Sequence, residues 1–328
     1  MELVLGLGSI FTDWFSSLYE MLFNPQKRVS IYYLVSATLV ALFWFYKPTN
    51  RSWPRLREQW LNPTYWWSSS AKLDYQLLIL NQLLMLLLKP FMLGKLAVAT
   101  LIYYTMADWF MPIRVAWSGA AWAIPIAYTL VLFVVDDASR YWVHRLMHRV
   151  PVLWAFHRLH HSAETLTPFT VLRTHPVESL LFGLRSVLVQ GFVTGVFVYL
   201  FGKQVSLWQV LGANGFIFIF NLLGANLRHS HVPLSYGKNI EKWLLSPAQH
   251  QLHHSVEVQH YDKNFGVVLA VWDRWGNTLC TYVSNQSLRF GVMDTHGAHN
   301  NLKQAYLQPF VQLVKTLIAP LERVFGKS

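Results

Sequence analysis

The sequence predicts an all-α integral membrane protein with about four to five transmembrane helices and a histidine-rich helical cap on the cytoplasmic side. Composition is the first indication, because 53% of the 328 residues are hydrophobic and only 13% are charged, whereas about one quarter are charged in soluble domains. Apolar runs long enough to cross a bilayer are the second. The third is a set of histidines at short helical spacings, which indicates a metal site at the ends of helices.

Five apolar runs approach the length of about twenty residues that a transmembrane helix needs. They cover residues 29–46, 73–93, 119–135, 177–201 and 205–227. The last two are separated only by residues 202–204, so we expect a helical hairpin whose ends return to the same side. A shorter run, 96–104, is expected to re-enter the membrane or to lie along its interface. Segment 1–20 has no basic start and no small-residue cleavage site, so we do not interpret it as a signal peptide.

This topology places every histidine group on one side of the membrane. The same side collects many basic residues, and an excess of Lys and Arg marks the cytoplasmic face. These residues are Lys47, Arg51, Arg55, Arg57, Lys72, Arg140, Arg145, Arg149, Arg158 and Arg173. We therefore expect a cytoplasmic histidine face, in a bacterial inner membrane rather than the endoplasmic reticulum. The net charge of +11 follows from this topology and from attraction to anionic lipids, and no nucleic-acid partner is expected.

Eight of the histidines form three groups in which the spacing is three or four residues. His144 and His148 are four apart, and the pattern His-x2-His-His occurs at residues 157–161 and again at 250–254. Each group can direct two or three imidazoles to one point, and imidazole is the commonest metal ligand. A zinc ion uses about three or four protein ligands, so eight histidines predict two metals close together. Cys280 is the single cysteine, which excludes a thiolate cluster.

Two acids follow the third apolar run, Asp136 and Asp137. A carboxylate at that position is costly unless it is paired, so we expect one of them either to fix a histidine tautomer or to anchor Arg140. Asp137 is a candidate outer-shell residue because it shares a helix stripe with His144. Four further acids are weaker candidates and are expected to be ordinary interfacial or surface charges: Glu164, Glu178, Glu257 and Asp262.

Seven short motifs between residues 135 and 278 resemble the sterol desaturase and fatty acid hydroxylase superfamily, in the order which that family shows. They are YWVHRLMH (141–148), WAFHRLHHS (154–162), RTHPVE (173–178), HSHVP (229–233), HQLHH (250–254), NFG (264–266) and WDR (272–274). The resemblance implies an integral membrane, non-haem dimetal oxygenase with a four-helix membrane core. Members hydroxylate, desaturate or oxidatively cleave lipids, including sterols, fatty acyl chains, sphingoid bases, alkylglycerol ethers and carotenoid-like substrates.

Carried over residue by residue, the resemblance assigns nine histidines as metal ligands. They are His144, His148, His157, His160, His161, His229, His250, His253 and His254. His175 lies in the His-Pro turn of the family and is expected in the outer shell. His231 stands where the family often has asparagine, so it is either a tenth ligand or an outer-shell donor. His260 is expected at the surface, and no metal role is expected for His296 or His299.

The predicted organisation has three parts: an N-terminal membrane region (1–118), a fatty acid hydroxylase-like catalytic domain (119–285) and a polar or amphipathic tail (286–328). Oxidising an unactivated C–H bond requires a stronger oxidant than a metal hydroxide, and iron can provide it from O2. We therefore expect two iron ions, with O2 as co-substrate and zinc as a possible replacement in purified protein. Because the sequence shows no nucleotide fingerprint and no cytochrome-like segment, a separate ferredoxin, cytochrome or reductase is expected to supply electrons, and a bilayer lipid is the expected substrate.

Two other classes of protein stay open as alternatives. A membrane electron carrier would use histidine pairs as axial haem ligands across helices inside the bilayer, whereas these histidines gather at helix ends. A metal transporter would need polar ligands within the apolar runs, which are nearly free of charge, and the motif His-Glu-x2-His of zinc proteases is absent. The sequence separates neither hydroxylation from desaturation and ether cleavage, nor one lipid class from another.

Overall fold

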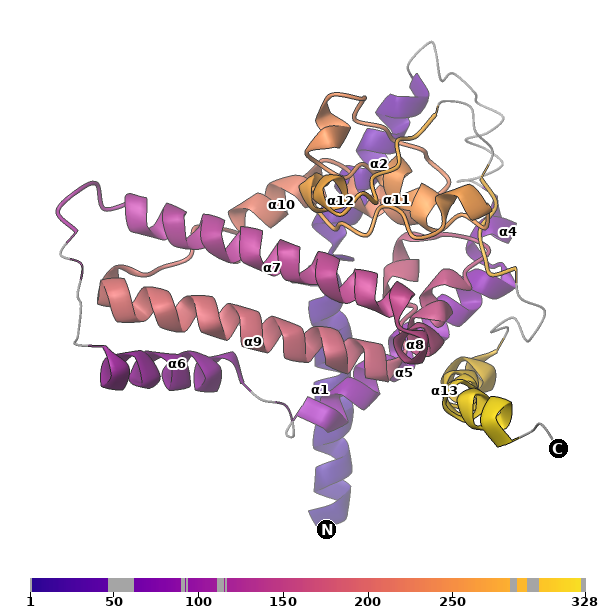
Figure 1. Cartoon of the computed structure of the whole chain (residues 1–328), viewed down its shortest axis with the longest axis horizontal. Coiled ribbons are helices and arrows are strands. Elements are labelled where there is room, and N and C mark those ends of the chain that lie inside the picture. Colours follow the sequence, from indigo (N-terminus) through magenta and orange to yellow (C-terminus); the bar gives the residue numbers. More distant parts are fainter. Residues whose placement is uncertain are drawn as a thin grey trace.

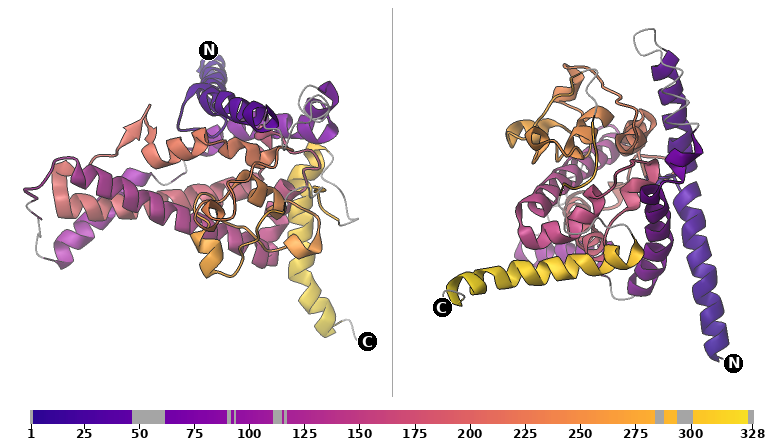
Figure 2. Two further views of the ribbon diagram at one scale, coloured as in Figure 1. Left: turned by 90° about the horizontal axis from the view of Figure 1, so that it is seen from above. Right: turned by 90° about the vertical axis from the view of Figure 1, so that its right-hand side faces the viewer.

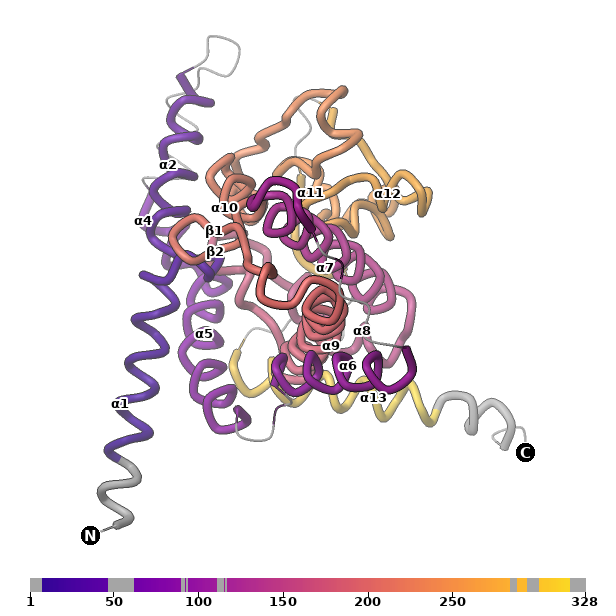
Figure 3. The backbone as a smooth tube through the Cα atoms, turned by 90° about the vertical axis from the view of Figure 1, so that its left-hand side faces the viewer, coloured from indigo at the N-terminus to yellow at the C-terminus, as the bar shows by residue number. Residues whose placement is uncertain are grey.

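The computed structural model describes residues 2–46, 62–89, 92, 94–110, 115, 117–283, 288–293 and 301–325. Within them the chain is mainly helical, as predicted. Helices α1 (Glu2–Phe23) and α2 (Ile31–Tyr46) follow one another along one side of the molecule (Figure 3). Six residues named in the sequence analysis lie outside the described residues: Lys47, Arg51, Arg55, Arg57, His296 and His299.

A stack of three helices forms the body of the molecule. Helix α9 (Pro176–Phe201) lies between α6 (Lys95–Trp109) and α7 (Ala123–Arg149) (Figure 1). The contact with α6 depends on two glycines four residues apart. A Cβ at Gly191 would lie 2.6 Å from the Cβ of Val98, and one at Gly195 would lie 2.7 Å from the carbonyl oxygen of Ala99. Small residues at this spacing allow helix backbones to approach closely.

Two of the described helices are long and apolar enough to cross a membrane. They are α5 (Ser69–Leu88) and α9 with its 3-10 extension, which together cover Pro176–Gln204. Helix α2 is apolar but shorter. The predicted run 119–135 becomes the first half of α7, whose second half carries Asp136, Asp137 and the first histidine group. The total of four to five spans stays a prediction.

The predicted spanning helix at 205–227 is wrong. The chain turns back after α9, as expected, but then forms a small antiparallel hairpin of β1 (Gln209–Val210) and β2 (Ala213–Asn214), followed by α10 (Gly215–Leu222) and a 3-10 turn (Ala225–His229). The backbone is left-handed at Gly202, Gly212 and Gly224, with φ of +57°, +81° and +86°. These positions interrupt helical hydrogen bonding in a segment that is otherwise apolar enough to span a membrane.

The remaining elements complete the histidine-bearing part and the C-terminal region. They are α4 (Pro63–Trp66), α8 (Pro151–His161), α11 (Pro247–His253), α12 (Val271–Trp275), α13 (Leu302–Phe325) and 3-10 turns at Pro168–Leu172, Gly202–Gln204, Ile240–Lys242 and Val258–His260. Helix α13 packs against α5 and α8 and then extends away from the body (Figure 2). Its outer residues Leu307, Val314 and Leu317 are exposed, which is typical of a helix that contacts a membrane interface.

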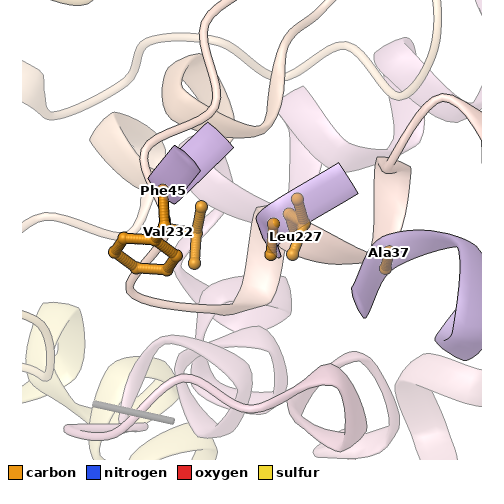
Figure 4. Close-up of a cluster of buried hydrophobic side chains, with 5 residues drawn as sticks. Ala37, Phe45, Leu227 and Val232 are labelled. Atoms are coloured by element: carbon orange, nitrogen blue, oxygen red, sulfur yellow. The ribbon is translucent and has the colours of Figure 1, made fainter. Parts of the chain in front are cut away.

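A small apolar cluster fastens α2 to the segment that carries His229. Ala37 and Phe45 of α2 pack with Leu227 and Val232, and all four side chains are buried (Figure 4). Because Leu227 and Val232 flank His229 in the sequence, this contact fixes the loop on both sides of that histidine.

Candidate metal centre

The structure brings the nine predicted ligands together from four elements and divides them into two groups. The first group consists of His144, His148, His157, His161 and His253, and the second of His160, His229, His250 and His254. Within each group the candidate ligand atoms all lie within 4.8 Å of one another. Eight of the nine rings are buried and one is half-buried. Each group therefore has enough converging imidazoles to hold one metal ion.

The two consecutive histidine pairs explain how the His-x2-His-His pattern serves both groups. Each pair is split, because the rings of His160 and His161 are 5.7 Å apart with an interplanar angle of 89°, and those of His253 and His254 are 5.5 Å apart at 86°. Helix α8 gives two histidines to the first group and one to the second, and α11 with its C-cap residue does the reverse. The rings of His161 and His254 stack at 4.5 Å where the groups meet.

In the first group, three outer hydrogen bonds set the orientation of the rings. The Nδ1 atom of His144 donates to the carbonyl oxygen of Phe265 (2.8 Å), and that of His253 donates to the carbonyl oxygen of Lys263 (2.7 Å). His157 Nδ1 donates to Glu178 Oε1 (2.9 Å). These bonds place the proton on Nδ1 and turn Nε2 inward. The Nε2 atoms of all five histidines are buried with no hydrogen-bond partner in the described part of the chain, as expected of a cation site.

In the second group, three nitrogens already stand at distances typical of ligands around one ion. The Nε2 atoms of His229, His250 and His254 lie 3.1–3.2 Å from one another. Bonds of about 2.0–2.1 Å in a tetrahedral site separate ligand nitrogens by about 3.3 Å. The fourth member, His160, has its ring 5.1 Å from that of His229 and 4.7 Å from that of His254. The donor set therefore fits a metal ion.

Burial keeps these imidazoles neutral. It lowers the pKa of all nine histidines, to about 3 for His157 and to about 4 for His160, and for eight of the nine the neighbouring imidazoles lower the pKa further. Neutral imidazole is the form that binds metal. The site is therefore ready to accept cations at neutral pH.

We expect metal-free protein to lose stability as the pH falls below about 6.5. The pKa of each buried histidine is lower in the folded state than its ordinary value near 6.5, so the unfolded chain takes up protons first. Stability is therefore fully present above the unfolded pKa and is lost as the pH falls toward the folded pKa. Thermal unfolding of chelator-treated protein across this pH range measures the loss, with metal-loaded protein as the control. An unfolding temperature independent of pH in metal-free protein would contradict the expectation.

The motif Asn264-Phe265-Gly266 holds the carbonyl group that orients His144. Asp273 accepts the backbone N–H groups of Phe265 (2.8 Å) and Gly266 (2.7 Å). A Cβ at Gly266 would lie 2.7 Å from the Asp273 carboxylate, so only glycine fits there. Asn264 is left-handed (φ +57°) and its side chain accepts the N–H of Cys280. The sequence analysis gave Asp273 no role, and its place in the WDR motif was the only signal.

The two acids of α7 have different partners. Asp136 accepts hydrogen bonds from Arg140 (2.7 Å) and Arg185 (3.0 Å), so the expectation that one of these acids anchors Arg140 is confirmed. The outer-shell role predicted for Asp137 is wrong. Its carboxylate accepts the N–H groups of Val268 and Leu269 and the indole N–H of Trp272. The physical reason is distance, because Asp137 precedes His144 by seven residues, about 10 Å along a helix axis.

The other histidines lie outside both groups. His175 caps α9, because its Nδ1 accepts the N–H of Val177 (3.2 Å), and its Nε2 donates to the carbonyl oxygen of Tyr306 (3.3 Å). We therefore place it at a helix end rather than beside a ligand. The expectation of a surface position for His260 is wrong, because the ring is buried against Ser255. His231 is half-buried between the rings of Tyr65 and Phe290.

Of the four weaker acidic candidates, one reaches a ligand. Glu178 is buried and bonded to His157, so the expectation of an ordinary interfacial charge is wrong for this residue. Glu257 and Asp262 instead form exposed pairs with Arg289 and Arg149, and Glu164 is exposed. The sequence signal for Glu178 was its position in the RTHPVE motif at the start of α9.

We expect Glu178→Ala to lower metal affinity or activity by about 10–100-fold, because loss of an outer-shell partner releases the ligand ring. Glu178→Gln should lose less metal affinity and activity than Glu178→Ala, since its amide oxygen can still accept a hydrogen bond from His157 Nδ1. Metal content after titration with a chelator measures the effect. Glu257→Ala is the matched control, because it removes an exposed carboxylate. Equal metal retention in Glu178→Ala and Glu257→Ala would exclude the outer-shell role.

Arg173 fastens the end of α8 to α5. Its guanidinium donates to the carbonyl oxygen of Leu159 (3.1 Å), to Ser162 Oγ (2.9 Å) and to Asp74 Oδ1 (3.0 Å). The carbonyl groups at a helix end have no partner within the helix, so Arg173 satisfies them beside the second histidine box. Arg158 and Arg173, two of the basic residues expected on the cytoplasmic side, are both buried, and the side of the membrane on which they lie stays a prediction.

Together, the fold and the site define a helical, histidine-rich protein with apolar helices long enough for a membrane and a buried centre able to hold two metal ions. Residues 129–278 match the fatty acid hydroxylase family model, and this segment contains all nine histidines. The resemblance predicted from the motifs is confirmed for this segment, which is similar to the fatty acid hydroxylase family.

Several curated proteins are similar to this chain over about half of its length. The chain is 29% identical over 180 residues to a Delta(7)-sterol 5(6)-desaturase of Gibberella zeae, which covers 55% of this chain and 48% of that protein. It is 31% identical over 160 residues to human alkylglycerol monooxygenase (49% and 32%) and 28% identical over 152 residues to an ornithine lipid hydroxylase of Rhizobium tropici (46% and 41%). The chain thus spans between about a third and a half of these relatives. No solved structure matches it.

Proposed function

We propose that this chain is a membrane-bound, O2-dependent oxygenase that hydroxylates or desaturates a lipid with two iron ions held by the two histidine groups. The observation that carries the proposal is the division of nine neutral imidazoles into a group of five and a group of four. Relatives named as a desaturase, a monooxygenase and a lipid hydroxylase support the reaction class. When bound, iron would supply the activation of O2 that oxidation of a C–H bond requires.

The residues of the chain prepare the site for that chemistry. Glu178 and the carbonyl oxygens of Phe265 and Lys263 hold three imidazoles in one tautomer and orientation. Burial of the rings excludes water, which protects reactive species from side reactions. Neighbouring rings are 4.5–5.7 Å apart, which leaves no space for a porphyrin between them and disfavours the haem alternative. Nine imidazoles also exceed the three ligands of a catalytic zinc site.

An open pocket of about 460 Å³ lies beside segments that carry the histidines, and we propose it as the place where the lipid binds. Its lining includes Glu164, His231 and Val256, which follow His161, His229 and His254 in the sequence by two or three residues. The rest of the lining, from residues 288–293, is mixed apolar and basic. The Nε2 atom of His231 is buried and has no hydrogen-bond partner among the described residues. We place the polar end of the substrate here, with His231 as the donor.

The remaining parts of the proposal concern the surroundings of the enzyme. We propose that the histidine side is cytoplasmic, in a bacterial inner membrane, because the basic residues flanking the apolar runs collect on that side. A separate ferredoxin, cytochrome or reductase would deliver electrons. Zinc in place of iron after purification would block turnover without disturbing the fold.

The test is lipid mass spectrometry on cells that express the wild-type chain or His160→Ala under 18O2. A product carrying one 18O atom would show hydroxylation, and loss of two hydrogens would show desaturation; either should depend on the wild-type protein. His296→Ala is the matched control, because the sequence predicts no metal role for that histidine. Iron-loaded wild-type protein with its electron donor but no oxidised lipid would contradict the proposal.

A further inference from the structure

A second cavity, of about 30 Å³, is lined by none of the nine histidines. It is enclosed by the residues before α2, by α7 and α10, by the 3-10 turn that precedes His229, and by the loop at Val267 and Val268. Its polar lining consists of Arg28, Asp136, Asp137, Arg140, Asn221 and Arg228. A volume of about 10–15 Å³ is enough for one water, so the cavity can take a small polyatomic group.

The two acids in the cavity wall are already committed to other partners. Asp136 accepts from Arg140 and Arg185 and also from the side-chain amide of Gln190 (3.0 Å). Both carboxylate oxygens of Asp137 accept hydrogen bonds from the loop at Val268 and Leu269, and one of them also accepts the indole N–H of Trp272. Neither acid forms an ion pair with Arg28 or Arg228 in the described part of the chain. The lining holds three arginines against two acids, so it carries more positive than negative charge.

Arg228 is placed to hold a ligand. Its side chain is buried, with Nε donating to the carbonyl oxygen of Ala225 (3.0 Å) and one terminal nitrogen donating to that of Val267 (3.1 Å). Among the described residues the other terminal nitrogen has no hydrogen-bond partner, and the guanidinium lies 5.5 Å from the centre of the Phe220 ring. Arg28 lines the same cavity and is half-buried. A guanidinium in a low-dielectric site is costly unless an anion compensates its charge.

We propose that this cavity binds a phosphate-type anion between Arg28 and Arg228, as the head group of an anionic lipid or as free phosphate. Guanidinium groups match tetrahedral oxyanions with paired, charge-assisted hydrogen bonds. A lipid source fits the position of the cavity, because Asp136 directly follows the apolar half of α7 and basic pockets between helices at such positions bind anionic head groups.

Such an anion would also stabilise two segments that hold residues of the metal centre. Arg228 directly precedes His229 of the second group, and Val267 follows the Phe265 carbonyl that orients His144. An anion that joins Arg28 to Arg228 would therefore fasten both segments to the residues before α2. Binding itself requires neither metal nor turnover, so it can be measured independently of the proposed activity.

The test is thermal unfolding of the full chain in three settings. These are nanodiscs of phosphatidylcholine alone, nanodiscs of phosphatidylcholine and phosphatidylglycerol in equal parts, and the first nanodiscs with added inorganic phosphate. We expect the unfolding temperature of the wild type to rise by about 3 °C or more with phosphatidylglycerol. Arg28→Gln should lose this rise. Lys27→Gln is the matched control, because it removes a neighbouring exposed charge and should keep the rise.

The three settings distinguish a lipid head group from free phosphate as the source of the anion, and their results can overturn the proposal. A rise with phosphatidylglycerol alone assigns the cavity to a lipid head group, and an equal rise with inorganic phosphate assigns it to the free anion. No rise in the wild type, or an equal rise in Arg28→Gln, overturns the proposal. If Arg28→Gln does not fold, Arg28→Lys keeps the charge and should keep the rise, and phosphorus retained per wild-type chain after detergent exchange gives a second measurement.

Discussion

His161→Ala is expected to lose the metal of the first group and to keep most of the metal of the second, whereas His160→Ala is expected to show the opposite pattern. The reason is that these neighbours direct their rings to different groups. Both variants should lose more than about a hundred-fold in activity, because loss of an outer-shell partner alone costs about 10–100-fold. Elemental analysis of the purified variants, combined with their lipid products, checks both parts.

The second histidine box offers an independent version of the same experiment. His253→Ala should behave like His161→Ala, and His254→Ala like His160→Ala. His175→Ala is the control, since it removes a histidine that contacts a backbone carbonyl rather than either group. Equal loss of both metals in all four ligand variants would show that the histidines form one shared centre, against the division into two.

Arg173→Ala is expected to lower the free energy of unfolding by about 3–5 kcal/mol, because it leaves the buried Asp74 carboxylate without its partner. It also removes one of the hydrogen bonds to the carbonyl oxygen of Leu159 at the end of α8, which keeps those from Ser162. Arg173→Lys should recover only part of the loss, since an ammonium cannot reproduce the fork of a guanidinium. Denaturant unfolding in detergent measures the change.

Two further variants test the cause of this loss. The double variant Arg173→Met with Asp74→Leu should be more stable than Arg173→Ala, because no unpaired charge stays buried. Arg149→Ala breaks an exposed pair with Asp262, whose side chains are 54% and 37% exposed, and should cost about 0–1 kcal/mol. If Arg173→Ala lowers the free energy of unfolding no more than Arg149→Ala does, the contacts of Arg173 with Asp74 and α8 do not stabilise the fold.

The histidines that gather at the centre could be predicted from the sequence, because spacings of three and four fix which side chains share a helix face. Their division between two groups could not, since His160 and His161 differ only in ring direction, which depends on how α8 and α11 cross. Asp273 was missed for a similar reason. It acts on His144 through the backbone of Phe265 and Gly266, and its place in the WDR motif does not reveal that contact.

The apolar run at 205–227 shows where composition alone predicts the wrong backbone. Hydropathy describes its composition correctly, but residues with positive φ, Leu211, Gly212 and Gly224, decide its backbone. Likewise, Asp137 shares a stripe with His144, yet its carboxylate reaches the loop at Val268 and Leu269 instead. Periodicity gives the direction of a side chain around a helix axis and says little about its partner along that axis.

The split histidine pairs also couple the two groups mechanically. One peptide unit joins His160 to His161, and another joins His253 to His254, so α8 and α11 each reach into both groups. The first ion to arrive would fix both helices, and the entropy cost of ordering the remaining ligands would then be smaller. Metal loading should accordingly be cooperative, with chains that hold exactly one ion rare at intermediate metal concentrations.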